Sequence, residues 1–174
     1  MLKFASRMDN MSASEIRELL KSASDPAIIK FSGGFPAPEL FPVKEMKEAS
    51  MKVFDEMGNA ALQYSSTDGY LPLREKIAKR MFDKQQIKID PANILMTSGS
   101  QMGLDFSARV FLDKDDVVLL EAPSYLGAIN AFKTCQPRFV AIPTDDDGML
   151  IDELKKAIAE NDNIKFCYVK CACK

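Results

Sequence analysis

From residue 93 onward, short apolar runs alternate with amphipathic stretches of helical periodicity. The apolar runs cover residues 94–97, 117–121, 139–143 and 165–169, and the helical stretches cover residues 101–112, 125–135 and 152–160. Strands that alternate with helices of this length form βαβ units, in which a mainly parallel sheet carries helices on its faces. The pattern therefore predicts an α/β fold with a mainly parallel sheet flanked by helices.

The residues before this alternation predict helices joined by fixed loops. Residues 31–42, FSGGFPAPELFP, hold two adjacent glycines and three prolines, which favours an extended loop after a first amphipathic helix. A second helix is expected over residues 43–57 and should end at Gly58, and a third is expected to begin near Pro72. The residues expected to face inward are Met46, Ala49, Val53 and Met57 in the second helix and Leu73, Ile77 and Met81 in the third.

The composition narrows the classes of partner and location. Of the 174 residues, 47% are hydrophobic and 28% are charged, with a formal net charge of -2, which is typical of a globular chain with a sizeable core. Basic residues are interleaved with acidic ones, so nucleic acid is not expected as a partner. The sequence shows neither the ~20 apolar residues of a membrane span nor a secretory leader, so a cytoplasmic location is expected.

The sequence contains no histidine, which excludes Ser-His-Asp and Cys-His nucleophile systems and histidine-based metal sites. The cysteines lack the paired C-x2-C spacing of a zinc site and are interpreted as free thiols: Cys135, Cys167, Cys171 and Cys173. The acidic run at residues 145–148 is interpreted as a turn rather than a calcium loop, because Leu154 stands where such a loop requires glutamate. No metal site is expected.

Between the apolar run at residues 94–97 and the following helix, the sequence reads SGSQ. In parallel α/β sheets, ligands collect at the carboxyl ends of strands, where helix N-termini present unpaired N–H groups and a partial positive charge. Gly99 allows a tight turn close to a ligand, and Ser100 and Gln101 add side-chain donors, so the turn predicts a site for a dianionic phosphate. It matches neither a P-loop nor G-x-G-x-x-G. The alternative is a serine cap on a core helix.

Four segments taken together resemble one known family: FSGGFPAPELFP, LQYSSTDGYLPLREKIAKR, ILMTSGSQMGLDF and DVVLLEAPSYLGAINAF. In this order they look like the N-terminal half of a pyridoxal-phosphate-dependent aminotransferase of fold type I, and within it the class I subgroup of kynurenine and 2-aminoadipate aminotransferases. The resemblance implies pyridoxal 5'-phosphate as cofactor, amino acids and 2-oxo acids as substrates, and a homodimer. It implies an N-terminal arm and small-domain segment over residues 1–60 and part of the large cofactor-binding domain over residues 61–174.

The resemblance also assigns roles to individual residues. Gly99, Ser100 and Gln101 would bind the cofactor phosphate, and Tyr125 of E-A-P-x-Y would stack on the pyridine ring, as an aromatic face can. Tyr64 of Q-Y-S would reach across a dimer interface to the cofactor phosphate of the neighbouring subunit. Viewed without the resemblance, Tyr125 and Tyr64 are also explained by packing against their own helices.

Two further residues would contact substrate. Gly34 would lie with its backbone beside the substrate carboxylate, where any Cβ would intrude. Arg17, on the N-terminal segment, would approach the bound substrate. A single arginine on an amphipathic helix is otherwise explained as part of a solvated face.

Aminotransferase chemistry also requires a lysine that binds the cofactor covalently, an aspartate that pairs with the pyridine nitrogen and an arginine that clamps the substrate carboxylate. In the family these lie downstream of the matching region, and after residue 169 this sequence departs from the expected N-P-x-G segment. We therefore expect a truncated chain that lacks the C-terminal half, is inactive alone and leaves the catalytic residues unknown. The alternatives are a pyridoxal-phosphate lyase of the same fold and a non-catalytic ligand-sensing or interaction domain.

Overall fold

The computed structural model of the protein describes residues 3–8 and 36–170 and falls into two compact units. One unit comprises Met1–Ser12 with Thr97–Lys174, and the other comprises Ala13–Met96. The domain division expected after residue 60 stays a prediction. Among the described helices, none combines the length and apolar character needed to cross a membrane.

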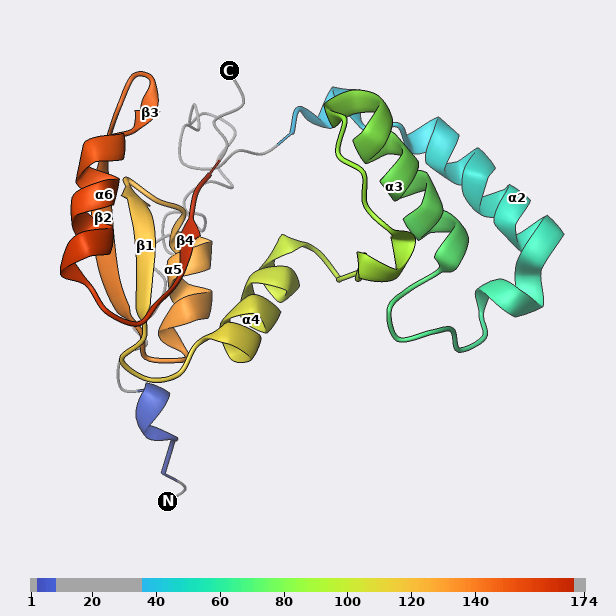
Figure 1. Cartoon of the computed structure of the whole chain (residues 1–174). Coiled ribbons are helices and arrows are strands. Elements are labelled where there is room, and N and C mark those ends of the chain that lie inside the picture. The colour runs from blue at the N-terminus through green and yellow to red at the C-terminus, as the bar shows by residue number, and fades with distance from the viewer. Residues whose placement is uncertain (1–2, 9–35, 171–174) are drawn as a thin grey trace, which may run out of the picture. The chain divides into compact units, whose positions relative to one another are not determined.

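A four-stranded sheet of order β3-β2-β1-β4 forms the centre of the unit that includes Thr97–Lys174 (Figure 1). Its strands are β1 (Val117–Ala122), β2 (Arg138–Asp145), β3 (Gly148–Met149) and β4 (Ile164–Tyr168). β1 pairs in parallel with both β2 and β4, whereas the short β3 runs antiparallel to β2. The mainly parallel sheet expected from the sequence is thus confirmed.

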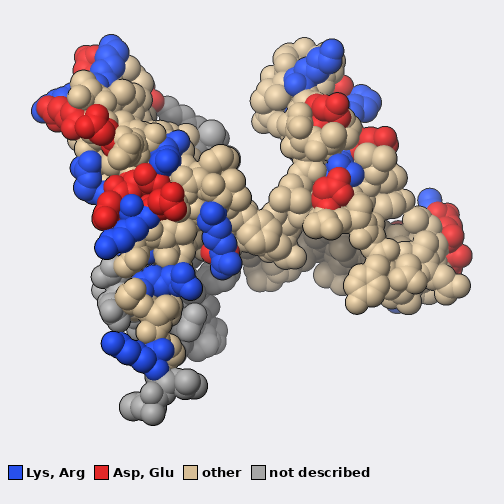
Figure 2. Space-filling view, turned by 60° about the horizontal axis from the view of Figure 1, so that its bottom comes forward, with Lys and Arg blue, Asp and Glu red and all other residues tan. Residues whose placement is uncertain are grey.

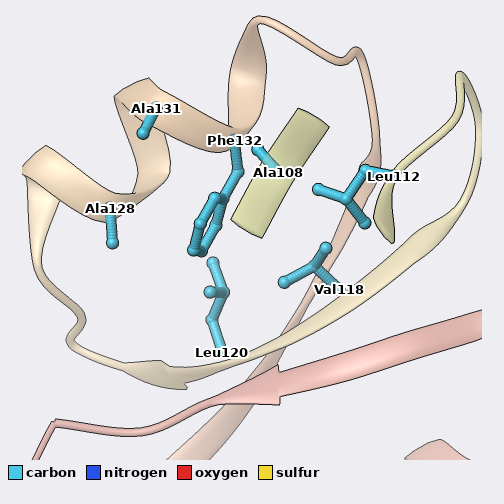
Figure 3. Packing of buried hydrophobic residues seen from close by; sticks show 7 residues of the cluster. All are labelled: Ala108, Leu112, Val118, Leu120, Ala128, Ala131 and Phe132. Carbon is cyan, nitrogen blue, oxygen red and sulfur yellow. The ribbon is translucent and has the colours of Figure 1, made fainter. Parts of the chain in front are cut away.

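Helices cover both faces of this sheet, and they are α4 (Ser100–Phe111), α5 (Leu126–Lys133) and α6 (Ile151–Glu160). The central strand β1 sends alternate side chains to opposite faces, as a pleated strand must. On the face of α4 and α5 the buried cluster is Ala108, Leu112, Val118, Leu120, Ala128, Ala131 and Phe132 (Figure 3). On the face of α6 it is Val117, Leu119, Ile142 and Ala157. The alternation is what places helices on both sides.

Phe132 joins α5 to the strand at the sheet edge. Its side chain is 1% exposed and packs edge to face against Phe166 and Tyr168 of β4, with ring centroids 5.2 and 5.7 Å apart. Aromatic pairs at these distances and angles stabilise a core beyond the area they bury. Phe132 therefore fixes the position of α5 over β1 and β4.

The turn at residues 145–148 closes the β2–β3 hairpin. The Asp145 carboxylate accepts hydrogen bonds from the N–H groups of Asp147 (2.9 Å) and Gly148 (3.2 Å), and Gly148 has a φ of +123°. Turns of this kind commonly contain an aspartate whose side chain accepts a hydrogen bond from the backbone N–H two residues later. The turn predicted from the sequence is present.

Residues 94–97 do not form the expected strand. Ile94 has an extended backbone (φ -110°, ψ 118°), but the Met96 N–H donates to the carbonyl of Asp68 (3.0 Å), and the described sheet contains no ladder to this segment. An extended segment becomes a strand only by pairing with a neighbour. The apolar pattern identified an extended segment correctly but could not supply its partner.

The Ala13–Met96 unit contains α2 (Val43–Ala61) and α3 (Leu71–Gln85), with short 3-10 turns at Pro38–Leu40 and Pro91–Asn93. The expected end of α2 at Gly58 is wrong, because one helical glycine weakens a helix by about 1 kcal/mol without ending it. The expected buried stripe is also wrong, because Met46 and Val53 are 61% and 43% exposed and Ala49 and Met57 are exposed too. The described elements leave this apolar face of α2 uncovered.

The buried face of α3 differs from the prediction at one position. Leu73 is 43% exposed, while Arg74, one residue on, is 6% exposed. Ile77 and Met81 are half-buried, as their spacing from Arg74 requires, because positions three and seven apart share a helix face. The inward stripe therefore runs through Arg74 rather than Leu73.

Arg74 is buried because every part of its guanidinium finds a partner. Nε donates to the carbonyl of Gly69 (3.1 Å), Nη1 donates to the carbonyl of Pro91 (2.9 Å), and Nη2 pairs with the Asp68 carboxylate (2.6 Å). A buried charge is tolerated when it is paired and hydrogen-bonded in this way. Arg74 thereby ties the loop before α3 to the turn after it.

Candidate functional site

The N-terminus of α4 lies at the turn that the sequence singled out. Gly99 is the residue before the helix, with φ +85° and ψ 165°, a backbone region essentially restricted to glycine. A Cβ added at Gly99 would meet nothing within 4 Å, so backbone conformation rather than crowding selects glycine here. No side chain caps the helix, and the alternative of a serine cap is therefore not supported. The N–H groups of the first turn remain available to an anion.

Gln101 connects this turn to the start of α5. Its side-chain Nε2 donates to the carbonyl of Gly127 at 3.0 Å, across 26 residues of sequence. Both α4 and α5 pack on the same face of the sheet and contact each other. The bond therefore holds two helix N-termini together at the carboxyl end of β1, where parallel sheets bind ligands.

Tyr125 is the residue before α5, at the end of the short turn that follows β1. Its carbonyl accepts the N–H groups of Ala128 (3.1 Å) and Ile129 (3.2 Å), which fixes its backbone to the first helical turn. Its side chain is 44% exposed, and the ring lies against Gly127, where a Cβ added to the glycine would fall 2.5 Å from Cζ. One side of the ring is thus supported by backbone, and the side chain keeps exposed surface for a planar ligand.

The residue before Tyr125 carries a polar group without a partner. The hydroxyl oxygen of Ser124 is buried and makes no hydrogen bond within the part of the chain that the structure describes. A buried polar group left unpaired costs about 1–3 kcal/mol. Within residues 3–8 and 36–170, the turn between β1 and α5 therefore holds one hydroxyl group with unused hydrogen-bonding capacity.

The ends of β1 and β4 carry groups with altered acidity. Partial burial raises the pKa of the Cys167 thiol, and the negative charge of Glu121 raises it further. Burial likewise raises the pKa of the Tyr168 phenol, with smaller effects from Tyr125 and Glu121. Glu121 itself accepts the N–H of Lys170 at 2.8 Å. The thiol and the phenol are therefore neutral near pH 7, which disfavours Cys167 as a nucleophile.

Charged side chains do not gather into one basic patch on the face shown in Figure 2, where blue and red groups are interspersed over much of the described surface. Several of these charges pair locally along helices, as Lys44 with Glu48 and Lys52 with Glu56 do on α2. This distribution is unlike the continuous basic footprint of a nucleic-acid-binding protein.

A family model described as aminotransferase class I and II matches residues 26–173. The match covers well over half of the 174 residues. The chain belongs to this family.

Individual aminotransferases support the assignment. The chain is 44% identical over 166 residues to 2-aminoadipate transaminase from Thermus thermophilus, covering 95% of this chain and 40% of that protein. It is 44% identical over 157 residues to aromatic-amino-acid aminotransferase 1 from Thermococcus litoralis, covering 90% of this chain and 38% of that protein. The structure of Pyrococcus horikoshii kynurenine aminotransferase, solved with PMP, matches with a TM-score of 0.86 at 37% identity, covering 95% of this chain and 42% of that one.

These comparisons confirm the family, the α/β fold type and pyridoxal 5'-phosphate as the cofactor of aminotransferases of this kind. The chain spans about two fifths of the length of the curated relatives it matches. The residues present also fit the phosphate and ring of this cofactor, since the uncapped N-terminus of α4 is linked by the Gln101–Gly127 hydrogen bond to the turn that carries the half-exposed Tyr125.

The structure brings some of the predicted aminotransferase site residues together. Gly99, Ser100 and Gln101 form the start of α4, and the Gln101 bond to Gly127 links them to the junction that carries Tyr125. Tyr64 belongs to the other compact unit, on the loop between α2 and α3, with its side chain 99% exposed. The remaining two predicted residues, Gly34 and Arg17, lie outside the described residues.

Three residues of structural importance were not singled out from the sequence. Gly127 was missed because its contact depends on the orientation of the Tyr125 ring. Ser124 was missed because burial of its hydroxyl follows from the packing of α5. Arg74 was missed because a charged side chain is ordinarily assigned to the solvated face of a helix. The signal available was its spacing of three and seven residues from Ile77 and Met81, which puts it on their face of the helix.

Proposed function

We propose that this chain supplies two cofactor-binding junctions, the turn before α4 and the turn between β1 and α5, of a pyridoxal-phosphate-dependent aminotransferase that moves an amino group between an amino acid and a 2-oxo acid. The observation that carries the proposal is the uncapped N-terminus of α4, preceded by Gly99 at φ +85°. Free N–H groups and the helix dipole favour a dianionic phosphate at this place. When bound, the cofactor supplies the electron sink that lets an amino group be exchanged.

The residues of the junctions have distinct tasks in this proposal. The hydroxyl of Ser100 and the first-turn N–H groups donate to phosphate oxygens. Gln101, whose amide nitrogen is bonded to Gly127, keeps that turn in register with α5. Tyr125 presents its ring to the pyridine, because one side of it is supported and the side chain is 44% exposed.

Further tasks involve a second subunit and the substrate. Tyr64 would reach the cofactor phosphate of a partner subunit in a homodimer, a role supported by its 99% exposure, which leaves the whole ring free to contact another chain. Gly34 and Arg17 would lie beside the substrate carboxylate. We place the protein in the cytoplasm. We also expect this chain to be inactive alone, because the given sequence contains no S-x-S-K motif with the lysine that would bind the cofactor covalently.

Equilibrium dialysis of the purified chain with pyridoxal phosphate tests the proposal, with pyridoxal as the matched ligand that lacks the phosphate. Pyridoxal closes to an internal hemiacetal and reacts less with surface lysines than pyridoxal phosphate does, so the comparison is repeated with pyridoxine 5'-phosphate and pyridoxine, which carry no aldehyde. A difference within that second pair reports the phosphate site. We expect pyridoxal phosphate to bind more tightly and Ser100→Ala to reduce the difference. Gly103→Ala is the control, because a Cβ there makes only an ordinary contact with Thr97 at 3.8 Å.

Equal affinity for pyridoxine 5'-phosphate and pyridoxine would contradict the phosphate site. Activity is measured separately, by incubating the loaded chain with an amino acid and a 2-oxo acid and following the new 2-oxo acid. Turnover by this chain alone would contradict the expected inactivity. Release of ammonia without a new amino acid would instead identify the lyase alternative.

A further inference from the structure

Gly127, the second residue of α5, contacts the side chains of Gln101 and Tyr125, both of which have tasks at the junctions in the proposed function. Its carbonyl accepts the Nε2 hydrogen bond of Gln101 at 3.0 Å. A Cβ on Gly127 would lie 2.5 Å from Cζ, 2.6 Å from Cε1 and 2.7 Å from the hydroxyl oxygen of Tyr125. The Tyr125 ring therefore occupies the space that a side chain at residue 127 would need.

We propose that Gly127 is a positioning residue, which sets the orientation of the Tyr125 ring and of the Gln101 amide and thereby the geometry in which the junctions hold pyridoxal phosphate. This inference rests on the proposed function. It assigns to Gly127 a task that neither α5 nor the sheet requires for folding.

Backbone conformation does not explain the glycine. The glycines with positive φ in the described chain are Gly69, Gly99 and Gly148, so Gly127 has ordinary helical geometry that alanine adopts readily. Glycine within a helix is less stable than alanine by about 0.5–1 kcal/mol. The contact with the Tyr125 ring is the feature of the structure that favours glycine at this position.

The crowding that alanine creates would be relieved by the ring and not by the helix. Ala128, the next residue, is 0% exposed and points into the core in Figure 3, so shifting the first turn of α5 would disturb the packing on β1. The atoms in the way are the far end of the Tyr125 side chain, which is 44% exposed and free to turn outward. Gly127→Ala should therefore move the ring while the fold is retained.

A double-mutant cycle on the full chain tests this inference, using wild type, Gly127→Ala, Tyr125→Ala and the double variant, with pyridoxal phosphate as the ligand in equilibrium dialysis. Gly127→Ala should weaken binding about three- to tenfold, the range that losing one aromatic stacking contact allows. In the Tyr125→Ala background the same change should have less than about a twofold effect, because the displaced ring is absent. Gly103→Ala, the same chemical change in α4, should leave binding unchanged.

The control measurement for folding is thermal unfolding by circular dichroism, in which Gly127→Ala should unfold at or above the wild-type temperature. The position of the ring is observed directly by the nuclear Overhauser effect between the Tyr125 ring protons and the Hα protons of residue 127. This effect should be strong in the wild-type chain and weak in Gly127→Ala. Equal losses of affinity in both backgrounds, or wild-type affinity in Gly127→Ala, would overturn the inference alone. Failure of the wild-type chain to bind would overturn the proposed function and this inference with it.

Discussion

Replacing Arg74 by methionine removes three polar interactions while keeping a side chain of similar length. The carbonyls of Gly69 and Pro91 lose their donors, and both residues are half-buried, so each loss costs about 1–1.5 kcal/mol, the lower part of the range for an unpaired buried group. The ion pair with Asp68 adds at most about 1 kcal/mol, because that carboxylate is 45% exposed and water can replace the guanidinium. The expected loss of unfolding free energy is therefore about 2–4 kcal/mol.

Urea unfolding followed by far-UV circular dichroism measures this loss. The matched controls are Arg80→Met, an exposed arginine on the same helix, expected within about 0.5 kcal/mol of wild type, and Asp68→Asn, expected to cost about 1 kcal/mol or less. If Arg74→Met is as stable as Arg80→Met, the three bonds do not hold the loops. If Asp68→Asn costs as much as Arg74→Met, the ion pair with Asp68 provides the stability. The larger share assigned to the hydrogen bonds with the Gly69 and Pro91 carbonyls is then wrong.

Three other outcomes are expected. Gly99→Ala should lose about 1–3 kcal/mol of unfolding free energy through backbone strain, whereas Gly103→Ala should gain up to about 1 kcal/mol through helix propensity, both measured by urea unfolding. If both variants are stabilised, or both are destabilised, the result would contradict the φ of +85° at Gly99. Alkylation of Cys167 by iodoacetamide, measured by peptide mass spectrometry, should be slow at pH 7 and should still be increasing with pH above 9.0, because the pKa of the thiol is raised above that ordinary value, and Glu121→Gln should speed the reaction. Phe132→Ala should cost about 3–5 kcal/mol, and a loss under 1 kcal/mol would refute its central place in the core.

The features that the sequence predicted well are those decided by neighbouring residues. The run Val117–Leu120 is apolar throughout, which is characteristic of a strand buried on both faces, and β1 is such a strand. The turn before α4 could be located because Gly99 is followed at once by helix-compatible residues. Local composition was sufficient at both places.

The features that were missed depend on what a side chain meets from elsewhere in the chain. Arg74 was not among the residues of α3 expected to face inward, and its three partners come from loops on either side of the helix. The apolar stripe of α2 was correct as a pattern, but the described chain offers no element to cover it. The role of Gly127 depends on a rotamer of Tyr125, which no spacing rule specifies.

The unequal clusters on the two faces of the sheet affect the order in which the fold comes apart. Of the buried residues, α6 contributes Ala157 alone, whereas α5 contributes Ala128, Ala131 and Phe132. Elements attached by fewer buried contacts open at a lower free energy. Under thermal fluctuation α6 should therefore detach before α5, and the junction that carries Tyr125 should remain assembled in the partly opened molecule.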